Sequence, residues 1–218
     1  MKKLLLFSIF LSLGSFISAQ VNQKQITVES TDQFLNFPVK RSNEQTMARV
    51  IIDGEVYDEF SLKLDADNPD FWTFLDVSRF QGKNLTVEVD NGDIAEEALE
   101  MVNADSRFPG QDSLYEEKYR QQVHFSSRRG WNNDPNGLVY YEGEYHLFYQ
   151  HYPYKAVWGP MHWGHAVSKD LVHWKHLPIA LKPDDLGYIF SGSVVVDKND
   201  SSGFFKGNSG LVAIYTNA

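Results

Sequence analysis

The peptide GWNNDPNG, residues 130–137, holds one carboxylate, Asp134, among amides, glycines and a proline. A residue that precedes a proline is pushed out of the helical region, so Pro135 is expected to hold Asp134 extended. Asn136 and Gly137 favour a turn, which we expect to lead into a strand. Turn formation alone accounts for this peptide. It also predicts a carboxylate fixed at a strand entrance, as glycoside cleavage needs to stabilise an oxocarbenium-like transition state.

Aromatic and amide side chains are concentrated around this peptide. Four of the five tryptophans lie between residues 131 and 174, together with Tyr149, Gln150, Asn132 and Asn133. Aromatic faces stack on sugar rings, and amide groups both donate and accept hydrogen bonds, which suits neighbouring hydroxyls. The composition therefore favours a sugar-binding site over a simple turn.

Histidines are also clustered here. Six of the seven lie between residues 146 and 176, and both His162-x-x-His165 and His173-x-x-His176 occur. Zinc binding is one interpretation, but residues three apart in a strand point to opposite faces, and His162 and His165 lie in a predicted strand. We expect hydrogen-bonded histidines in a polar-lined β core, with no metal site and no cofactor.

The elements that position these residues are predicted to be strands. GLVYYEGEYHLFYQ predicts a hairpin through Glu142 and Gly143, and further strands are expected in MHWGHAVS, HWKHLPIAL, SGSVVVD and LVAIYTN. Four short strands followed by the start of another set are typical of propeller blades. A propeller has roughly 4 to 8 blades, so residues 119–218 are expected to form one blade and part of a second, incomplete at the C-terminus.

Residues 31–91 predict a small β-sandwich-like domain, with a tight hairpin at Asp53-Gly54. Three aromatic residues there either form an exposed platform for sugar or fill the small core, and the size of the domain favours the core. They are Phe71, Trp72 and Phe74. Residues 92–118, which include a segment of helical composition and Pro109-Gly110, are expected to connect the two domains.

The first residues have the features of a secretory signal. Lys2 and Lys3 precede a short apolar run, and small residues come before Gln20. We expect residues 1–19 to be a signal peptide, rather than a buried helix or a membrane anchor, and residues 20–30 to be a linker. The protein is then periplasmic or extracellular. Loss of both lysines changes the formal net charge from -9 to -11, which argues against nucleic-acid partners and suits a neutral substrate.

Several spaced motifs carry a family resemblance. WNNDPNG, HLFYQ, WGPMHWGHAVSKDLVHW and FSGS, in this order, closely resemble the start of family 32 of the glycoside hydrolases, which comprises invertases, levanases, inulinases and fructan β-fructosidases. The resemblance covers about residues 119–218 and implies a five-bladed propeller that cleaves β-fructofuranosyl linkages of sucrose or fructans with retention. Arabinan and xylan hydrolases share this ring, but WNNDPNG with FSGS favours the fructose-specific group. Residues 31–91 look similar to a small β domain of Bacteroidetes-type members.

The resemblance also implies roles for individual residues. Asp134 would be the nucleophile that forms a fructosyl-enzyme intermediate. The residues implied to bind the substrate are Asn133 at the fructosyl hydroxyls, Gln150 and Trp158 in the same subsite, Phe190 and Ser191 at its edge, and Trp131 in a hydrophobic wall.

The sequence departs from the family in three places. Asn132 stands where many relatives carry Met, and residues 151–155 differ from the usual loop, which concerns leaving-group selectivity. The Arg-Asp-Pro motif and the acid/base glutamate of the family have no counterpart, and the turn-forming Asp184, Asp185 and Asp197 are not expected to replace them. We therefore expect a truncated hydrolase, nearly inactive alone. The alternatives are a fructan-binding module that does not cut and a non-functional remnant.

Overall fold

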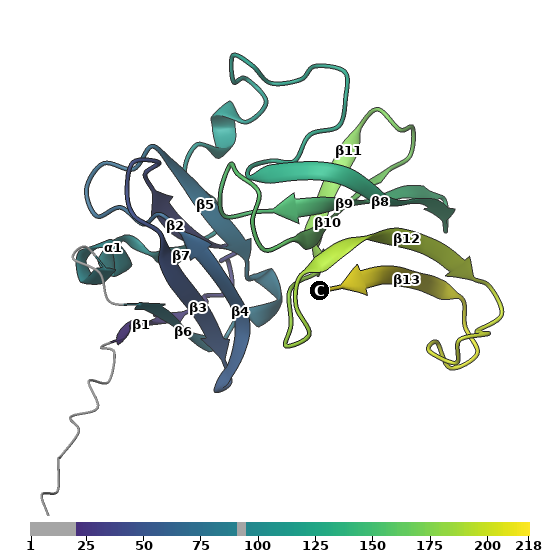
Figure 1. The fold of residues 1–218 in the computed structure, drawn as a ribbon, viewed down its shortest axis with the longest axis horizontal. Helices are drawn as coiled ribbons and strands as arrows, with labels where there is room; N and C mark the ends of the chain where they lie inside the picture. The colour runs from purple at the N-terminus through teal and green to yellow at the C-terminus, as the bar shows by residue number, and fades with distance from the viewer. Residues whose placement is uncertain (1–20, 91–94) are drawn as a thin grey trace, which may run out of the picture.

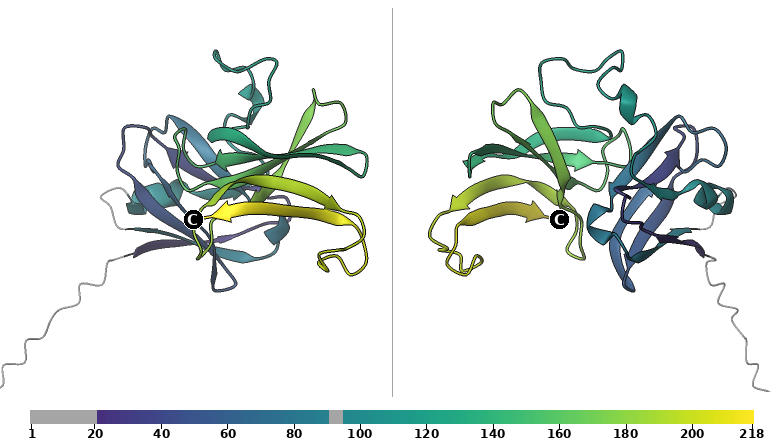
Figure 2. Two further views of the ribbon diagram at one scale, coloured as in Figure 1. Left: turned by 45° about the vertical axis from the view of Figure 1, so that its right-hand side comes forward. Right: turned by 180° about the vertical axis from the view of Figure 1, so that it is seen from behind.

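The computed structural model describes residues 21–90 and 95–218, so the predicted signal peptide lies outside the described residues. These residues hold thirteen β-strands, one α-helix and two short 3-10 helices, which confirms the all-β prediction. Figure 1 shows an N-terminal and a C-terminal group of strands side by side, and the two views of Figure 2 show the same arrangement. No helix in the described part of the chain has the length and apolar character needed to cross a bilayer.

The N-terminal group is a β-sandwich of two antiparallel sheets. One sheet has the order β1-β6-β3-β4 and the other β5-β2-β7. Phe37 and Phe60, one from each sheet, are fully buried and meet edge to face with ring centroids 5.3 Å apart. The core therefore lies between the sheets. The strands are β1 (Val21–Thr27), β2 (Phe34–Val39), β3 (Thr46–Ile52), β4 (Glu55–Leu62), β5 (Phe71–Asp76), β6 (Asn84–Asp90) and β7 (Asn103–Asp105).

The hairpin between β3 and β4 follows from its turn residues. Asp53 and Gly54 have φ values of 55° and 85°, as a two-residue type I′ turn requires. Ala48, Val50 and Ile52 alternate along β3 and are all buried. The predicted turn is confirmed, and the strand before it alternates as expected for one with a single buried face.

Two segments that were expected to be connections contain strands. β1 lies within residues 20–30 and pairs with β6 from Val21 to Thr27. β7 lies within residues 92–118 and pairs with β2, just after helix α1 (Ala95–Met101). Both are edge strands, which main-chain hydrogen bonds along one side hold in place. Their side chains therefore carry little apolar pattern for a sequence to reveal.

The aromatic residues of β5 are neither a free platform nor a sealed core, because Phe71, Trp72 and Phe74 are all half-buried. Phe74 stacks on Phe108 with ring centroids 4.1 Å apart. The guanidinium of Arg41 lies 5.2 Å from the centre of the Phe71 ring. These rings therefore fill space at the margin of the sandwich, partly under arginine side chains.

The C-terminal group begins with a four-stranded antiparallel sheet of order β11-β10-β9-β8. Strands that are consecutive in the sequence are neighbours in this sheet, which is the topology of one propeller blade. The pair β12-β13 corresponds to the start of another blade. Gly137 of β8 lies against β12, since a Cβ there would be 2.6 Å from Val194 Cγ2. The described sheets do not close into a ring. The strands are β8 (Trp131–Tyr141), β9 (Glu144–Tyr152), β10 (His162–Ser168), β11 (Trp174–Leu181), β12 (Ile189–Asp197) and β13 (Gly210–Asn217).

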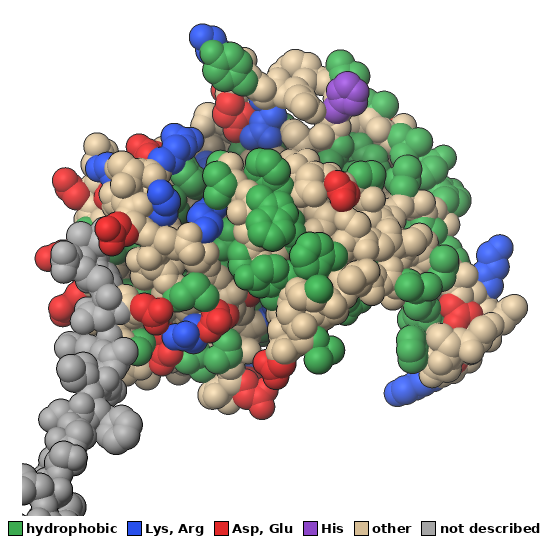
Figure 3. Space-filling model, viewed as in Figure 1, with side chains coloured by type: hydrophobic (Ala, Val, Ile, Leu, Met, Phe, Trp, Pro, Cys, Tyr) green, Lys and Arg blue, Asp and Glu red, His purple; other side chains and the backbone are tan. Residues whose placement is uncertain are grey.

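The surface differs between the two groups. Figure 3 shows most of the charged side chains of this face over the N-terminal sheets and the adjoining loop, and apolar side chains over much of the C-terminal sheets. Leu138, Tyr140, Val195 and Ile214 of β8, β12 and β13 are between 46% and 61% exposed. The C-terminal sheets thus present apolar faces that the described residues leave uncovered.

Candidate active site

The peptide that contains Asp134 is a bulged strand and not a turn, which corrects the expectation from its sequence. Residues 131–137 all lie in β8, and the register with β9 shifts on both sides of Pro135. The bulges accommodate the proline within the paired strand, because a bulge removes the need for a regular ladder hydrogen bond. Asn136, within the bulged stretch, is buried. The carboxylate therefore projects from a bulge in the first strand of the blade.

Both oxygens of the Asp134 carboxylate accept a hydrogen bond, although the residue is exposed. Asn133 Nδ2 donates to Oδ1 at 3.2 Å, and Ser191 Oγ of β12 donates to Oδ2 at 2.8 Å. Trp131 Nε1 in turn donates to Asn133 Oδ1 at 2.8 Å. Four of the residues expected at the site, Trp131, Asn133, Asp134 and Ser191, thus form one continuous chain of hydrogen bonds across β8 and β12.

Gln150 lies beneath this chain and joins three strands. It is buried, and its Nε2 donates to the main-chain oxygen of Ile189 at 3.0 Å. With the Asn136 amide oriented so that its oxygen faces β9, that oxygen accepts from Gln150 N at 3.0 Å and from Trp163 Nε1 at 2.9 Å. Asn136 and Gln150 therefore form a buried polar layer that supports the bulge.

Phe190 and Trp158 are not part of the hydrogen-bonded chain that includes Asp134. Phe190 is half-buried, and its main-chain oxygen accepts from Trp163 Nε1 at 3.0 Å. Trp158, in the loop between β9 and β10, is 52% exposed and meets the Tyr188 ring edge to face with centroids 6.4 Å apart. The structure thus ties Phe190 to the layer below the carboxylate, and it places Trp158 in a separate aromatic pair.

His151 is a neutral histidine at the base of Trp131. Burial lowers the pKa of His151 to about 3. Its ring is therefore neutral at physiological pH, and Nδ1 carries the proton that is donated to the main-chain oxygen of Trp131 at 2.7 Å. His151 is one of the clustered histidines that the sequence led us to expect in a hydrogen-bonded β core, although its place against Trp131 was not predicted. Asn136 was missed as a support because an Asn-Gly pair is typical of turns.

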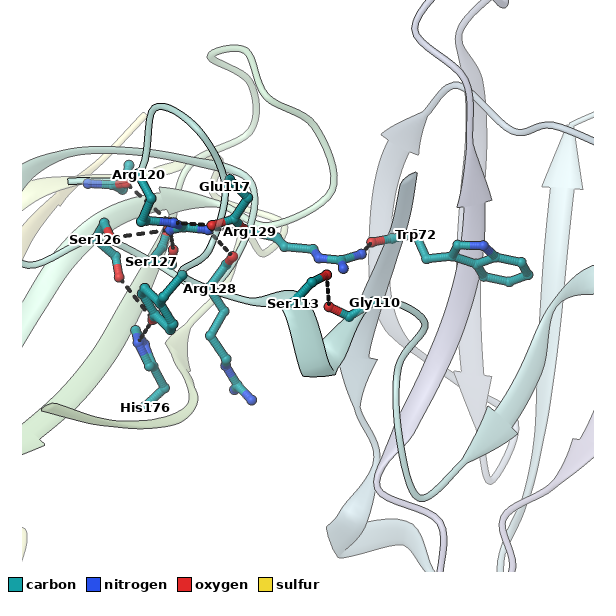
Figure 4. A network of polar contacts seen from close by, with 12 residues as sticks. Trp72, Gly110, Ser113, Glu117, Arg120, Ser126, Ser127, Arg128, Arg129 and His176 are labelled. Carbon is teal, nitrogen blue, oxygen red and sulfur yellow. Dashed lines mark hydrogen bonds and ion pairs between the residues drawn. The ribbon is translucent and has the colours of Figure 1, made fainter. Parts of the chain in front are cut away.

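The loop that leads into β8 is held by a network of arginines (Figure 4). Arg120 pairs with Glu117 at 2.6 Å and also donates to the main-chain oxygen of Ser127 at 2.7 Å. The hydrogen bond from Arg120 holds the pKa of Glu117 at about 2. Arg129 reaches the sandwich, where it donates to the main-chain oxygen of Trp72. The start of β8 is thereby fastened both to its own loop and to β5.

A hollow of about 350 Å³ lies between this network and the sandwich. Its lining includes Arg41 and Phe71 from the sandwich, Arg120 from the loop, and Gly130 and Asn132 at the beginning of β8. Open space thus extends from the N-terminal sheets to the strand that carries Asp134.

The histidines whose spacing suggested zinc binding make other contacts. His162 Nδ1 donates to the main-chain oxygen of Pro160 at 2.9 Å, whereas His165 contacts His146 at 3.1 Å. Within the described residues, no group of three or more His, Cys, Asp or Glu side chains is placed to hold a metal ion. The chemistry available at Asp134 is that of an oriented, accessible carboxylate.

The fold and the site define an all-β protein in which the first strand of a blade-like sheet presents a carboxylate among amide, hydroxyl and indole donors. The sequence model described as "Glycosyl hydrolases family 32 N-terminal domain" matches residues 124–218. The predicted resemblance to family 32 is therefore confirmed for this part of the chain.

Individual relatives match about half of the chain. A levanase from Bacillus subtilis is 68% identical over 105 residues, which are 48% of this chain and 16% of the relative. A fructan beta-fructosidase from Streptococcus mutans is 62% identical over 103 residues, 47% of this chain and 7% of the relative. The crystal structure of an exo-inulinase from Aspergillus awamori is 48% identical, with a TM-score of 0.43, over 45% of this chain and 20% of that one. The chain thus spans less than a quarter of each of these relatives.

Proposed function

We propose that Asp134 is the nucleophile of a retaining glycoside hydrolase that acts on β-fructofuranosyl linkages. The observation that carries this proposal is that the carboxylate is solvent-accessible while donors from Asn133 and Ser191 fix its two oxygens. In a retaining mechanism such an oxygen attacks the anomeric carbon and forms a glycosyl ester that water later hydrolyses. The names of the relatives, which include a levanase and a fructan beta-fructosidase, support a fructosyl substrate.

The neighbouring residues divide into two sets in this proposal. Trp131 supplies an apolar wall, and Asn133 and Ser191, beside the carboxylate, hydrogen-bond the fructosyl hydroxyls. Gln150 and Phe190 shape the floor of the subsite from the layer below. Trp158, exposed in its loop, stacks on the sugar from the side. The substrate is sucrose or a fructan. Export by the N-terminal signal places the protein where such sugars occur.

The 218-residue polypeptide taken alone is proposed to be a slow catalyst. A retaining enzyme needs a second carboxyl group about 5 to 5.5 Å from the nucleophile to protonate the leaving oxygen. The sequence contains no Arg-Asp-Pro motif and no counterpart of the family's glutamate. General acid catalysis contributes on the order of 10² to 10⁴-fold, so its loss slows the cleavage of unactivated sugars severely.

Fructose release tests this part of the proposal. The polypeptide, its Asp134→Asn variant and a full-length family 32 enzyme are incubated with sucrose, levan and inulin. We expect little fructose from the polypeptide. A rate near that of the full-length enzyme, abolished by Asp134→Asn, would contradict the proposed lack of activity while supporting the nucleophile.

A second candidate is a fructan-binding module that does not cut. The exposed indoles of Trp131 and Trp158 favour it, because aromatic faces bind sugars without needing an acid. Calorimetry with fructo-oligosaccharides separates the two candidates. A binding module gives a saturable isotherm that survives Asp134→Asn, whereas a partial catalytic site gives no saturation.

A further inference from the structure

The sandwich and the site are joined through a buried tyrosine, Tyr152, at the end of β9. Tyr152 is fully buried, and its hydroxyl donates to the main-chain oxygen of Ser61 in β4 at 2.6 Å. The same hydroxyl accepts from Ser61 N at 3.0 Å. A single phenol thus makes two main-chain hydrogen bonds across the interface, and a buried hydroxyl with these partners is costly to move.

Tyr152 is also the direct pairing partner of Trp131. The register of β8 and β9 places Trp131 opposite Tyr152. Gly130, just before Trp131, lies so close to Tyr152 that a Cβ there would be 2.4 Å from the Tyr152 main-chain oxygen. The position of the Tyr152 main chain therefore sets where β8 begins.

From Trp131 the contacts run to the carboxylate. Trp131 Nε1 donates to Asn133 Oδ1 at 2.8 Å, and Asn133 Nδ2 donates to Asp134 Oδ1 at 3.2 Å. Asn133 has one side-chain amide, so the bond it accepts and the bond it donates fix the same rotamer. A displaced indole at Trp131 would therefore turn the amide that orients Asp134.

We propose that Tyr152 is a positioning residue, through which the N-terminal sandwich sets the orientation of Trp131 and thereby of the Asp134 carboxylate. The role of the carboxylate in this statement rests on the proposed function, whereas the link from Ser61 to Trp131 does not. The sandwich then helps to position the site. Removal of the Tyr152 hydroxyl changes the orientation of Trp131 and Asp134 without removing any group that touches substrate.

Tyr154 offers a matched control at the same interface. It is fully buried, stacks on Phe60 with ring centroids 3.5 Å apart, and donates its hydroxyl to Asp58 at 2.8 Å. It lies beyond the last residue of β9 and has no pairing partner in β8. Loss of its hydroxyl weakens the interface without acting on Trp131.

The experiment compares Tyr152→Phe and Tyr154→Phe in the full chain. The indole N–H signal of Trp131, assigned with Trp131→Phe, is followed by NMR. In parallel, β-fructofuranosyl fluoride is added, because fluoride leaves without protonation, and attachment of a fructosyl group to Asp134 is timed by mass spectrometry. We expect Tyr152→Phe to move the Trp131 signal and to slow attachment about fivefold, the effect of roughly one hydrogen bond. Tyr154→Phe is expected to leave both unchanged.

The outcomes separate this inference from the proposed function. If the wild-type chain gains no fructosyl group but Tyr152→Phe still moves the Trp131 signal, the positioning role stands and the nucleophile does not. An unmoved Trp131 signal, or an equal effect of both tyrosine variants, would overturn the positioning role. Ser61→Ala keeps the two main-chain hydrogen bonds of the Tyr152 hydroxyl and serves as a milder variant. It removes the 3.1 Å contact between Ser61 Oγ and that hydroxyl, together with the 3.0 Å hydrogen bond from Lys155 Nζ to Ser61 Oγ. Ser61→Ala is expected to move the Trp131 signal in the same direction as Tyr152→Phe, but less. If Tyr152→Phe does not fold, an unmoved Trp131 signal in Ser61→Ala would count against the proposal.

Discussion

Asp134 combines accessibility with a fixed orientation, which is what an attacking carboxylate requires. Each of its two oxygens accepts a hydrogen bond, one from Asn133 in the same strand and one from Ser191 in β12. Exposed carboxylates usually rotate freely, and ordering one costs entropy that the two hydrogen bonds offset here. At the scale of single residues, the site is defined by these two donors as much as by the carboxylate.

The hydrogen bond from Ser191 is testable by itself. Ser191→Ala removes the donor to Asp134 Oδ2, and a hydrogen bond to a charged group contributes about 1.5 to 3 kcal/mol, less at an exposed site. We expect fructosyl attachment from β-fructofuranosyl fluoride to slow about tenfold, as timed by mass spectrometry. Ser193→Ala, exposed on the same strand, is the control. Equal rates for both variants would count against a role for Ser191.

Asn136 is expected to matter for stability. Asn136→Ala leaves Gln150 N without the side-chain oxygen that accepts from it, whereas Trp163 Nε1 keeps the Phe190 main-chain oxygen as an acceptor. A buried unsatisfied group costs about 1 to 3 kcal/mol, so we expect the free energy of unfolding in urea to fall by about that amount. Asn133→Ala, from the exposed part of the same peptide, should change it by less than about 0.5 kcal/mol. A smaller effect at Asn136 than at Asn133 would show that the buried layer does not support the bulge.

At the scale of elements, strands with an apolar pattern or a turn signal could be predicted, and edge strands and the bulge could not. The hairpins at Asp53-Gly54 and Glu142-Gly143 each have a glycine as the second turn residue, and all four residues adopt positive φ. β1 and β7 depend on pairing with β6 and β2, which are distant in sequence. The bulge in β8 depends on the burial of Asn136 against β9 and β10, and a tertiary contact of this kind overrides the local preference of Asn-Gly for a turn.

Three histidines, the buried His151 of β9 and the half-buried His165 of β10 and His176 of β11, predict a pH dependence of stability. Burial lowers the pKa of His151 to about 3 and those of His165 and His176 to about 4. Between these values and the unfolded value near 6.5, the unfolded chain binds more protons than the folded one, so stability is lost as pH falls through this range. We expect a lower free energy of unfolding at pH 5 than at pH 7, measured with urea.

Two variants control this pH prediction. His173, whose side chain is 87% exposed, lies outside the buried set, so His173→Gln should preserve the difference between pH 5 and pH 7. His151→Gln removes one buried group and should reduce the difference. A difference that is unchanged in His151→Gln would mean that other groups take up the protons.

At the scale of the whole molecule, the sandwich and the blade share a buried interface that the sequence did not reveal. Tyr152, Tyr154 and Met161 of the C-terminal half pack into the core of the sandwich. The sequence indicated only a loop for Tyr152 and Tyr154 and a strand for Met161, and no partner for any of them, because a residue's partner in another sheet leaves no local pattern. The motifs around Asp134, by contrast, could be identified from the sequence, because their residue types alone indicate the chemistry of the site.

The uncovered apolar faces of the C-terminal sheets predict self-association of the 218-residue polypeptide. Leu138 and Ile214 are each 61% exposed, and extended apolar surface of this kind promotes contact between copies. We expect sedimentation velocity to show concentration-dependent association that Leu138→Lys combined with Ile214→Lys reduces. Val56→Lys, at a site 57% exposed on the sandwich, should have no effect. A monomer at all concentrations would contradict this prediction and would also argue against a poorly folded remnant.

The most direct test of the account is to trap the fructosyl group on its nucleophile. The polypeptide is treated with β-fructofuranosyl fluoride, digested and mapped by mass spectrometry. The account predicts one added fructosyl unit on the peptide that contains Asp134, and none in Asp134→Asn, because attack on an activated sugar requires the nucleophile and not the general acid. A fructosyl unit on another residue, or no difference between the polypeptide and Asp134→Asn, would contradict the assignment of Asp134 as the nucleophile.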